Sequence, residues 1–355
     1  IMLLSIRRLV NTCIINTFPL NLLPRKLFNL ANFFIASKFE RGSVDYLPIS
    51  MDVEPTTACN FKCTMCAVSM PDFTAKNMNI ETFKKAIDDN PQLLKIKLQG
   101  LGEVLTNKQF FDMVKYAKTK GIVCETTTNG SLLNSKNINL LRDSGMSRIM
   151  VSIDGATKST FEEIRVQSNF KVVVDGARQL IKQCKKKFLR PQISAWCVLQ
   201  NSNYHEIYEI FELCRDMGFD DLSYQIQLTS WGGQEYWLDA NKSKQINFNA
   251  EQVQNDVEKL RSLARDNNFA LHIYEGNALT FEKQCEWPFR TSHITADGSI
   301  VPCALISDPE VVTLGNINEE SYSTIWQSKD YKEFRENIKN NKLDDYCKDC
   351  YLEYR

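Results

Sequence analysis

Three cysteines lie close together in one short stretch of the chain, and their spacing suits an iron–sulfur cluster. Cys59, Cys63 and Cys66 follow the pattern CxxxCxxC. Iron–sulfur cubes are held by cysteine thiolates, so three thiolates on one loop can hold three of the four irons of a [4Fe–4S] cluster. The fourth iron then has no protein ligand, and an open position on a metal allows a small molecule to bind there. The stretch therefore predicts a catalytic cluster.

A zinc knuckle, or a group of buried free thiols, is the alternative interpretation of this stretch. Tetrahedral zinc sites use four ligands, often in CxxC pairs. No Cys or His follows Cys66 until Cys124. The spacing therefore favours the iron–sulfur cluster over zinc.

The cysteine loop resembles that of the radical S-adenosylmethionine (SAM) enzymes, and further motifs follow it in the family's order. Gly-Glu resembles the family's GGE element, Thr-Asn-Gly its TNG element, and Val-Ser-Ile-Asp-Gly its SxDG element. An Arg follows at the family's position, and a Met fills the slot beside the last cluster cysteine. The resemblance assigns SAM binding to Met65, Gly102, Glu103, Asn129, Ser152 and Arg165.

The resemblance also implies a mechanism. SAM chelates the open iron through its amino and carboxylate groups, and an electron from the cluster releases a 5′-deoxyadenosyl radical, which abstracts hydrogen from an unactivated carbon. Glu103 would contact the SAM amino group, a charge-assisted hydrogen bond. Ser152 would reach the ribose or the carboxylate, and the forked donors of Arg165 suit the carboxylate. Met65 would lie against the adenine, where many relatives have an aromatic residue.

Two of these assignments have ordinary structural alternatives. Leu101 replaces the first Gly of the family's pair, and Val104 replaces the Pro that often follows its Glu. Gly102–Glu103 could therefore be a simple strand-to-helix turn. Arg165 could instead form a helix-surface salt bridge with Glu162, as many helices do.

Strand and helix patterns alternate after residue 47, which predicts parallel strands with crossover helices. The six expected strands cover residues 49–54, 93–99, 122–127, 148–153, 193–199 and 222–228. They predict an α/β fold, a partial (β/α)6 TIM-like barrel over residues 49–275. Active sites of such barrels lie at the carboxyl ends of the strands. Each motif above follows a predicted strand, which supports a shared site.

A second cysteine set lies near the C-terminus and consists of Cys285, Cys303, Cys347 and Cys350. Asp297-Gly298 between them is typical of a hairpin turn, and a helix is expected near residues 322–340. The pattern resembles the SPASM/twitch domains of radical SAM enzymes, here a small α+β domain over residues 276–355. The resemblance implies one auxiliary [4Fe–4S] cluster with four thiolates, which would accept an electron. A structural zinc ribbon is the alternative.

Composition limits the remaining possibilities. The chain has 43 basic and 43 acidic residues, so it lacks the basic excess of a nucleic-acid binder. The cysteines are grouped as in metal sites, no signal peptide is recognised and no run of 18 apolar residues exists, which predicts a cytoplasmic protein without a membrane span. Cys124, Cys184, Cys197 and Cys214 are expected to be buried thiols.

Two segments lie outside these motifs. Residues 1–48 have apolar helical patterns and a local charge of +4 from six basic and two acidic residues. We expect this helical extension to pack on the barrel, and contact with a membrane surface is the alternative. Residues 229–249 contain Trp231 to Trp237; they either cover the substrate or form a surface loop.

Together these features predict a radical SAM oxidoreductase or epimerase that acts on a sugar, cyclitol or similar small molecule and takes electrons from a flavodoxin or ferredoxin. A peptide maturase is the enzymatic alternative, although such enzymes often have an N-terminal leader-binding domain for which residues 1–48 look too short. A non-catalytic zinc or electron-transfer protein is the third possibility.

Overall fold

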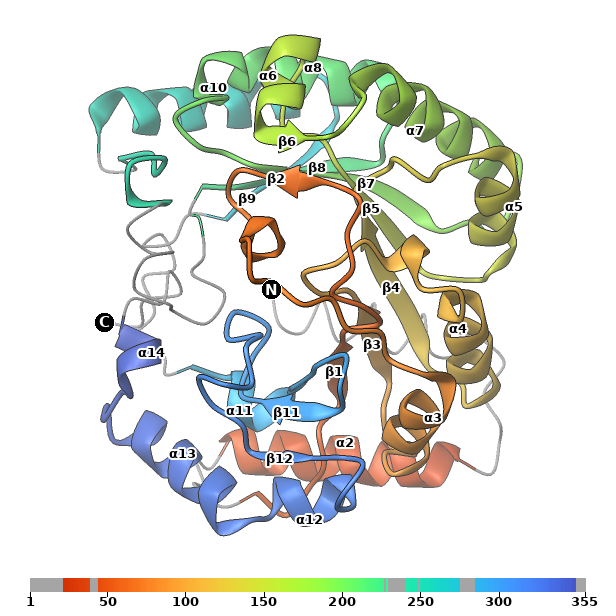
Figure 1. Ribbon diagram of the computed structural model, residues 1–355, viewed down its shortest axis with the longest axis vertical. Coiled ribbons are helices and arrows are strands. Elements are labelled where there is room, and N and C mark those ends of the chain that lie inside the picture. The colour runs from red at the N-terminus through yellow and green to blue at the C-terminus, as the bar shows by residue number, and fades with distance from the viewer. Residues whose placement is uncertain are drawn as a thin grey trace. The chain divides into compact units, whose positions relative to one another are not determined.

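The computed structural model describes residues 22–38, 44–226, 228, 241–247, 250–274 and 285–348, and Figure 1 shows its helices and strands. Cys350 and the segment from Trp231 to Trp237 lie outside this part. The chain divides into two compact units. The first unit comprises residues 1–58, 76–125 and 283–348, and the second comprises residues 59–75, 126–282 and 349–355. The domain boundaries expected after residues 48 and 275 stay a prediction.

A mixed sheet forms the centre of the first unit. Its order is β12 (Gly315–Asn316), β11 (Ser299–Val301), β10 (His293–Ile294), β1 (Ser50–Val53), β3 (Lys95–Leu98) and β4 (Val123–Thr128), of which residues 123–125 belong to this unit. β1 pairs in parallel with both β3 and β10, whereas β10, β11 and β12 pair antiparallel. The Asp297-Gly298 turn joins β10 to β11, and Gly298 has the positive φ of 87° that such a turn favours. The expected hairpin is therefore confirmed.

Buried and half-buried side chains alternate along β1 and β3, so that each strand has one fully buried face. Met51, Val53, Ile96 and Leu98 are fully buried, and the helices α3 (Ile80–Asp88) and α4 (Phe110–Thr119) lie beside β3 (Figure 1). Asn79 caps the start of α3, because its side chain accepts a hydrogen bond from the backbone N–H of Thr82 at 2.8 Å.

The helix expected over residues 322–340 is two helices in the structure. α12 (Tyr322–Trp326) ends before α13 (Lys329–Lys339) begins. The side chain of Ser328 accepts a hydrogen bond from the backbone N–H of Tyr331 at 3.1 Å. This serine side chain satisfies a donor at the start of α13, so a new helix begins there.

A buried arginine organises the packing of these two helices. The guanidinium of Arg335 lies 4.1 Å from the ring centres of both Trp326 and Tyr331. It also donates hydrogen bonds of 2.8 Å to the backbone carbonyls of Pro288 and Trp326. These carbonyls and aromatic faces allow the cation to be buried, although no carboxylate of the described residues forms an ion pair with it.

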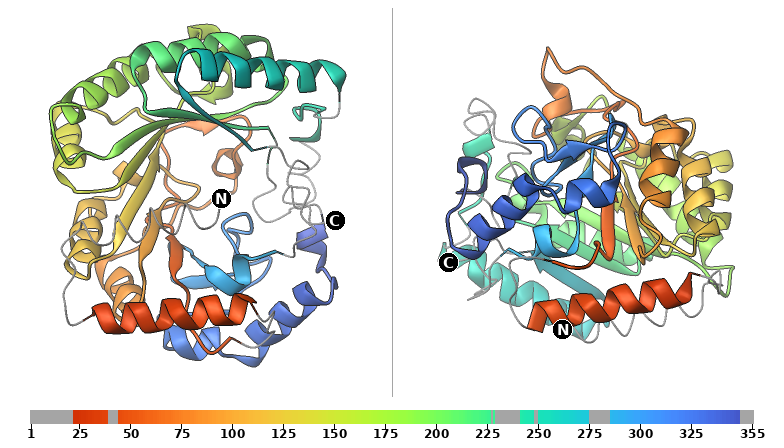
Figure 2. Two further views of the ribbon diagram at one scale, coloured as in Figure 1. Left: turned by 180° about the vertical axis from the view of Figure 1, so that it is seen from behind. Right: turned by 90° about the horizontal axis from the view of Figure 1, so that it is seen from below.

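The second unit contains four parallel strands in the order β5 (Arg148–Ser152), β7 (Gln192–Val198), β8 (Asp221–Gln225) and β9 (Ala270–Tyr274). Its helices include α5 (Ser135–Asp143), α7 (Phe170–Cys184), α8 (Ile207–Met217) and α10 (Glu251–Asp266), which line the outer face of these strands (Figure 2). All six predicted barrel strands are present. β9 was not predicted; His272 interrupts its apolar residues, and its side chains alternate between exposed and half-buried positions.

The four scattered cysteines at positions 124, 184, 197 and 214 are buried, as expected. None of the helices in the described ranges has the length and apolar content needed to cross a membrane.

Candidate active site

Two very short strands fix the cysteine loop in the second unit. β2 (Lys62–Cys63) pairs antiparallel with β6 (Arg165–Val166), and Cys63 lies directly opposite Arg165. The backbone N–H of Thr64 also donates a hydrogen bond of 2.9 Å to the carbonyl of Ile164. This backbone pairing places an arginine next to a predicted cluster ligand across about 100 residues of sequence.

Hydrogen-bond donors surround the cysteine sulfurs. Asn129 Nδ2 lies 3.8 Å from Cys59 Sγ, and the backbone N–H of Phe61 donates to the same sulfur at 3.4 Å. Arg165 Nη1 lies 4.0 Å from Cys63 Sγ. Donors of this kind stabilise a thiolate and tune the potential of an iron–sulfur cluster. The structure therefore brings the predicted residues Asn129 and Arg165 to the cysteine loop.

The three thiols are also close enough to affect one another. The pKa of Cys63 is raised to about 11, chiefly by burial, with Arg165 lowering it and Asp154 and Cys59 raising it. The pKa of Cys66 is raised to about 12, chiefly by burial, with smaller raising contributions from Cys63 and Cys59. The three thiols therefore lie within electrostatic reach of one another on the same loop.

Arg165 forms a buried ion pair that the sequence did not reveal. Its Nη2 lies 2.6 Å from Asp154 Oδ2, and both side chains are nearly or fully buried. Asp154 Oδ1 in turn accepts a hydrogen bond of 2.8 Å from the backbone N–H of Val198. The alternative of a surface salt bridge with Glu162 is wrong, because Glu162 accepts a hydrogen bond from the backbone of Phe170 instead. The sequence offered one signal for this pair: Asp154 lies in the same Val-Ser-Ile-Asp-Gly motif as Ser152, and its charge is opposite to that of Arg165.

Replacing Asp154 should destabilise the protein. Asp154→Asn keeps an acceptor for Val198 but leaves the buried guanidinium of Arg165 without its carboxylate. We expect the free energy of unfolding to fall by about 3 kcal/mol, since breaking a buried ion pair from one side is costly. Urea unfolding of the anaerobically purified protein would measure this.

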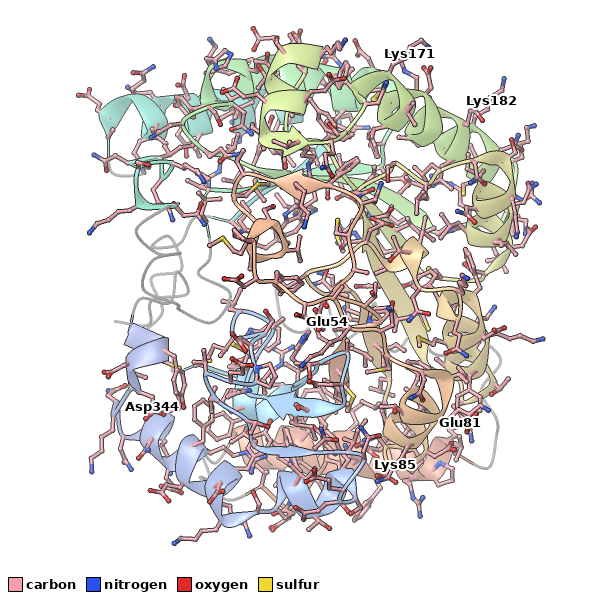
Figure 3. The ribbon with its side chains drawn as sticks, viewed as in Figure 1. Glu54, Glu81, Lys85, Lys171, Lys182 and Asp344 are labelled. Atoms are coloured by element: carbon pink, nitrogen blue, oxygen red, sulfur yellow. The ribbon has the colours of Figure 1, made fainter. Side chains whose placement is uncertain are left out.

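The matched control is Asp175→Asn, which removes the exposed ion pair between Asp175 and Lys171 on α7; Figure 3 labels Lys171. Exposed pairs contribute only about 0.5 kcal/mol. If Asp154→Asn cost no more than this control, Asp154 would not be the partner that holds Arg165.

Two further residues that the sequence did not indicate bind the backbone of the cysteine loop. Asn241 Nδ2 donates a hydrogen bond of 3.4 Å to the carbonyl of Met65, and Lys244 donates to the carbonyl of Thr64. Both belong to the second unit. They follow the undescribed segment after β8, and no motif marks them. Their contacts hold the backbone of the loop between Cys63 and Cys66.

Met65 and Ser152, two other predicted SAM contacts, also belong to the second unit. Both side chains are buried. Ser152 is the last residue of β5 and lies opposite Trp196 of β7 in the parallel register. Its position at a carboxyl strand end agrees with the predicted location. Its contact with SAM remains a prediction, as does that of Met65.

Gly102 and Glu103 lie in the first unit. Their backbone N–H groups donate hydrogen bonds to the carbonyls of Thr56 at 3.2 Å and Ala58 at 2.9 Å. A Cβ atom on Gly102 would lie 2.5 Å from the carbonyl oxygen of Thr56, so this close approach requires glycine. The buried Glu103 side chain accepts a hydrogen bond of 3.2 Å from the backbone N–H of Leu105. The segment is thus an ordered turn, and contact of Glu103 with SAM remains a prediction.

A buried carboxylate joins three segments of the first unit. Glu54 Oε1 accepts a hydrogen bond of 2.8 Å from the backbone N–H of Leu101, and Oε2 accepts one of 3.2 Å from that of Ala296. A Cβ on Gly100 would lie 2.2 Å from Glu54 Cγ. Gly100 is therefore needed for space beside Glu54. The carboxylate holds the turn before Gly102 and the β10–β11 hairpin to the strand that leads into the cysteine loop.

Glu54 should make stability depend on pH. Burial raises its pKa from 4.5 to about 7, although the two N–H donors act in the opposite direction. Between these values the folded protein keeps a proton that the unfolded chain has lost, so stability falls as the pH rises through this window. The penalty is absent below pH 4.5 and complete above about pH 7, with an upper limit of about 3 kcal/mol.

Glu54→Gln should remove this pH dependence. Relative to the wild type, the variant should gain stability as the pH rises from 5 to 8, as measured by urea unfolding at several pH values. Glu81→Gln, at an exposed position on α3, controls for the loss of a carboxylate (Figure 3). Parallel pH profiles for the wild type and Glu54→Gln would contradict the expected effect of burial.

Three of the four C-terminal cysteines lie in the described part of the first unit and are half-buried thiols. The carbonyl of Cys303 accepts a hydrogen bond of 3.1 Å from Ile306, and the N–H of Cys347 donates one of 2.8 Å to Asp344. Both Cys347 and Cys303 contribute to raising the pKa of Tyr346, after burial and the hydrogen bond to Asp344. These two thiols therefore lie near one tyrosine. Ligation of a cluster by Cys285, Cys303, Cys347 and Cys350 remains a prediction.

The donor set fits iron–sulfur cubes. Both predicted ligand sets consist of cysteines, and hydrogen-bond donors from Asn129 and Arg165 point at sulfurs of the N-terminal set. Within the described ranges, no group of three His, Cys, Asp or Glu side chains could hold a metal ion. A cube takes each thiolate on a different iron, so it does not need ligands that converge on one ion.

Comparison with known proteins agrees with this geometry. Residues 53–214 match the model of the radical SAM superfamily, and residues 285–351 match that of the SPASM iron–sulfur cluster-binding domain. The chain is 25% identical over 322 residues to the tungsten-containing aldehyde ferredoxin oxidoreductase cofactor-modifying protein of Pyrococcus furiosus, covering 84% of this chain and 86% of the relative.

Two further relatives are informative. The subtilosin biosynthesis protein AlbA of Bacillus subtilis is 24% identical over 327 residues, which cover 88% of this chain and 69% of AlbA. The structure of Streptococcus suis SuiB bound to its precursor peptide SuiA superposes with a TM-score of 0.68 at 14% identity, covering 89% of this chain and 72% of SuiB. The chain therefore belongs to the radical SAM enzyme superfamily, has its partial (β/α) barrel fold and carries a C-terminal SPASM domain, so that its cofactors are SAM, a SAM-binding [4Fe–4S] cluster and an auxiliary iron–sulfur cluster.

Proposed function

We propose that this radical SAM enzyme oxidises or epimerises a carbon of a small metabolite such as a sugar or cyclitol. The observation that carries the proposal is the presence of two cysteine sets, one with three thiols and one with the spacing of a closed four-thiolate site. When bound, SAM and its cluster supply hydrogen-atom abstraction, and the auxiliary cluster supplies an acceptor for the second electron of an oxidation to C=O, while the hydroxyl proton passes to solvent.

The chain's own residues hold and orient these groups. Cys59, Cys63 and Cys66 would hold the first cluster, and Asn129 and Arg165 would donate to two of its thiolates. Asp154 keeps the guanidinium of Arg165 in place. The SAM amino group would be bound by Glu103, and the SAM carboxylate by Arg165 or Ser152.

Peptide modification is the second candidate, and the relatives motivate it. AlbA is named for bacteriocin biosynthesis, and the SuiB structure contains a precursor peptide. Against it, the described part of residues 1–48 includes a helix, α2 (Leu23–Lys38), that is hydrogen-bonded into the first unit through Lys26 and Asn29. Helix α2 is therefore part of the first unit and not of a separate leader-binding domain.

We place the enzyme in a reducing compartment, the cytoplasm, because its cysteines are grouped as in metal sites. A flavodoxin or ferredoxin would supply the electron that reduces the SAM-binding cluster. The net charge of zero argues against nucleic acid as a partner.

Release of 5′-deoxyadenosine separates the two candidates. The reduced protein is incubated anaerobically with SAM and either a panel of cyclitols and sugars or a panel of peptides. We expect one of the cyclitols or sugars to raise the release of 5′-deoxyadenosine at least about tenfold over SAM alone. Substrate binding commonly causes the closure that completes an active site and commits the enzyme to reaction. Deuterium transfer from the labelled substrate would identify the attacked carbon. Stimulation by peptides alone would replace this proposal with peptide modification.

A further inference from the structure

Helix α2 is attached to the first unit by a polar side. Lys26 is only 1% exposed, and its ammonium donates hydrogen bonds to the carbonyls of Leu93 and Gly121. Asn29 exchanges two hydrogen bonds with the backbone of Leu47, at 2.8 and 2.9 Å. Leu30 and Phe33 complete this buried side. These polar contacts fix the rotation of α2 about its own axis, because a rotated helix would leave the polar groups of Lys26 and Asn29 without their hydrogen-bond partners.

The opposite side of α2 is apolar and exposed. Leu27, Phe28 and Ile35 are 54%, 69% and 52% exposed, respectively, and Ala31 between them is also exposed. At the spacing of an α-helix these four residues form one stripe about 100° wide. Figure 2 shows α2 on the outer side of the first unit. A surface helix normally buries its apolar side chains, whereas α2 buries Lys26 and Asn29 beside Leu30 and Phe33 and leaves a second apolar stripe exposed.

The charge of the surrounding segment indicates what covers this stripe. Residues 1–48 have six basic and two acidic residues, a net charge of +4, or +3 without the buried Lys26, whereas the whole chain has none. The remaining residues therefore have a net charge of −4, since 43 basic and 43 acidic residues are present in total. A second copy that docked through the same stripe would bring two positive segments together. An anionic surface would instead be attracted.

We propose that α2 docks this enzyme on the surface of an anionic phospholipid membrane through Leu27, Phe28, Ala31 and Ile35. Apolar side chains inserted at the headgroup boundary and basic residues beside anionic lipids are the two contributions that interfacial helices use. Arg25, exposed at the start of α2, is one such basic residue. Lys26 and Asn29 keep the stripe pointing away from the first unit. The proposal concerns attachment and does not depend on the substrate proposed above.

Vesicle flotation of the full-length, cluster-loaded protein tests this. Vesicles of equal parts phosphatidylglycerol and phosphatidylcholine are compared with phosphatidylcholine alone, at about 0.1 M salt, where exposed charges still interact. We expect at least about tenfold more protein on the anionic vesicles. The double variant Leu27→Glu/Phe28→Glu should lose at least about tenfold of this binding, because two charges replace the inserted side chains. Arg25→Ser should weaken binding to anionic vesicles only.

The matched control is Phe188→Glu. Phe188 is 100% exposed and lies in the second unit, far from α2 in sequence, so its replacement should leave vesicle binding unchanged. Unchanged SAM cleavage by all variants would show that they fold and load their clusters. Absence of flotation, or equal flotation of wild type and the double variant, would overturn the proposal. So would a dimer in size-exclusion chromatography that Phe28→Glu disrupts, since the stripe would then bind a second copy.

Discussion

Cys63→Ala should abolish the cleavage of SAM. Cys63 is one of three thiols on the loop that β2 and β6 hold together, and Arg165 lies directly opposite it. Without this thiolate a cube has only two protein ligands on the loop, so the cluster with an open iron should not assemble. Release of 5′-deoxyadenosine after reduction by dithionite should fall below detection. Iron should fall from about eight to about four atoms per chain, with the visible absorption of the C-terminal cluster retained.

Cys214→Ala is the appropriate control for this variant. Cys214 lies in α8 of the same unit and is fully buried, so its replacement removes a thiol of equal size from a site with no predicted ligand role. It should keep all of its iron and its SAM cleavage. SAM cleavage by Cys63→Ala at the rate of this control would exclude Cys63 as a ligand of the catalytic cluster.

Cys347→Ala should separate SAM cleavage from substrate oxidation. Cys347 lies in α14 (Asp345–Lys348), where its N–H is bonded to the carbonyl of Asp344. Loss of its thiolate should prevent assembly of the auxiliary cluster and leave the second electron without an acceptor. We expect 5′-deoxyadenosine release within about twofold of the wild type, since the catalytic loop is unchanged, and loss of at least about 100-fold in oxidised product.

Product analysis by mass spectrometry together with iron content would measure this uncoupling. Cys184→Ala, at the buried C-terminal end of α7, is the corresponding control because Cys184 has no predicted ligand role. Normal oxidation by Cys347→Ala without its auxiliary cluster would show that the electron leaves by another route. Loss of both activities would instead indicate that the C-terminal domain is needed for folding.

The sequence alone was sufficient to predict the two cysteine sets and most of the strands. Thiol spacing within one loop is a local property, so CxxxCxxC could be read directly from Cys59 to Cys66. The barrel strands are also local, since each is a short apolar run bounded by turn residues. The prediction of one helix over residues 322–340 was less accurate, because the cap at Ser328 interrupts an otherwise continuous helical pattern.

Tertiary structure alone decided which residues support the loop. Arg165 reaches Cys63 because two short strands pair across the fold, and Asp154 rather than Glu162 becomes its partner because both are buried together. Likewise, the orientation of α2 follows from Lys26 and its two distant carbonyl partners. Such contacts join residues far apart in sequence, and their geometry depends on how the chain folds as a whole; the spacing of residues along the chain therefore determines the chemistry, and only the folded structure determines what holds it in place.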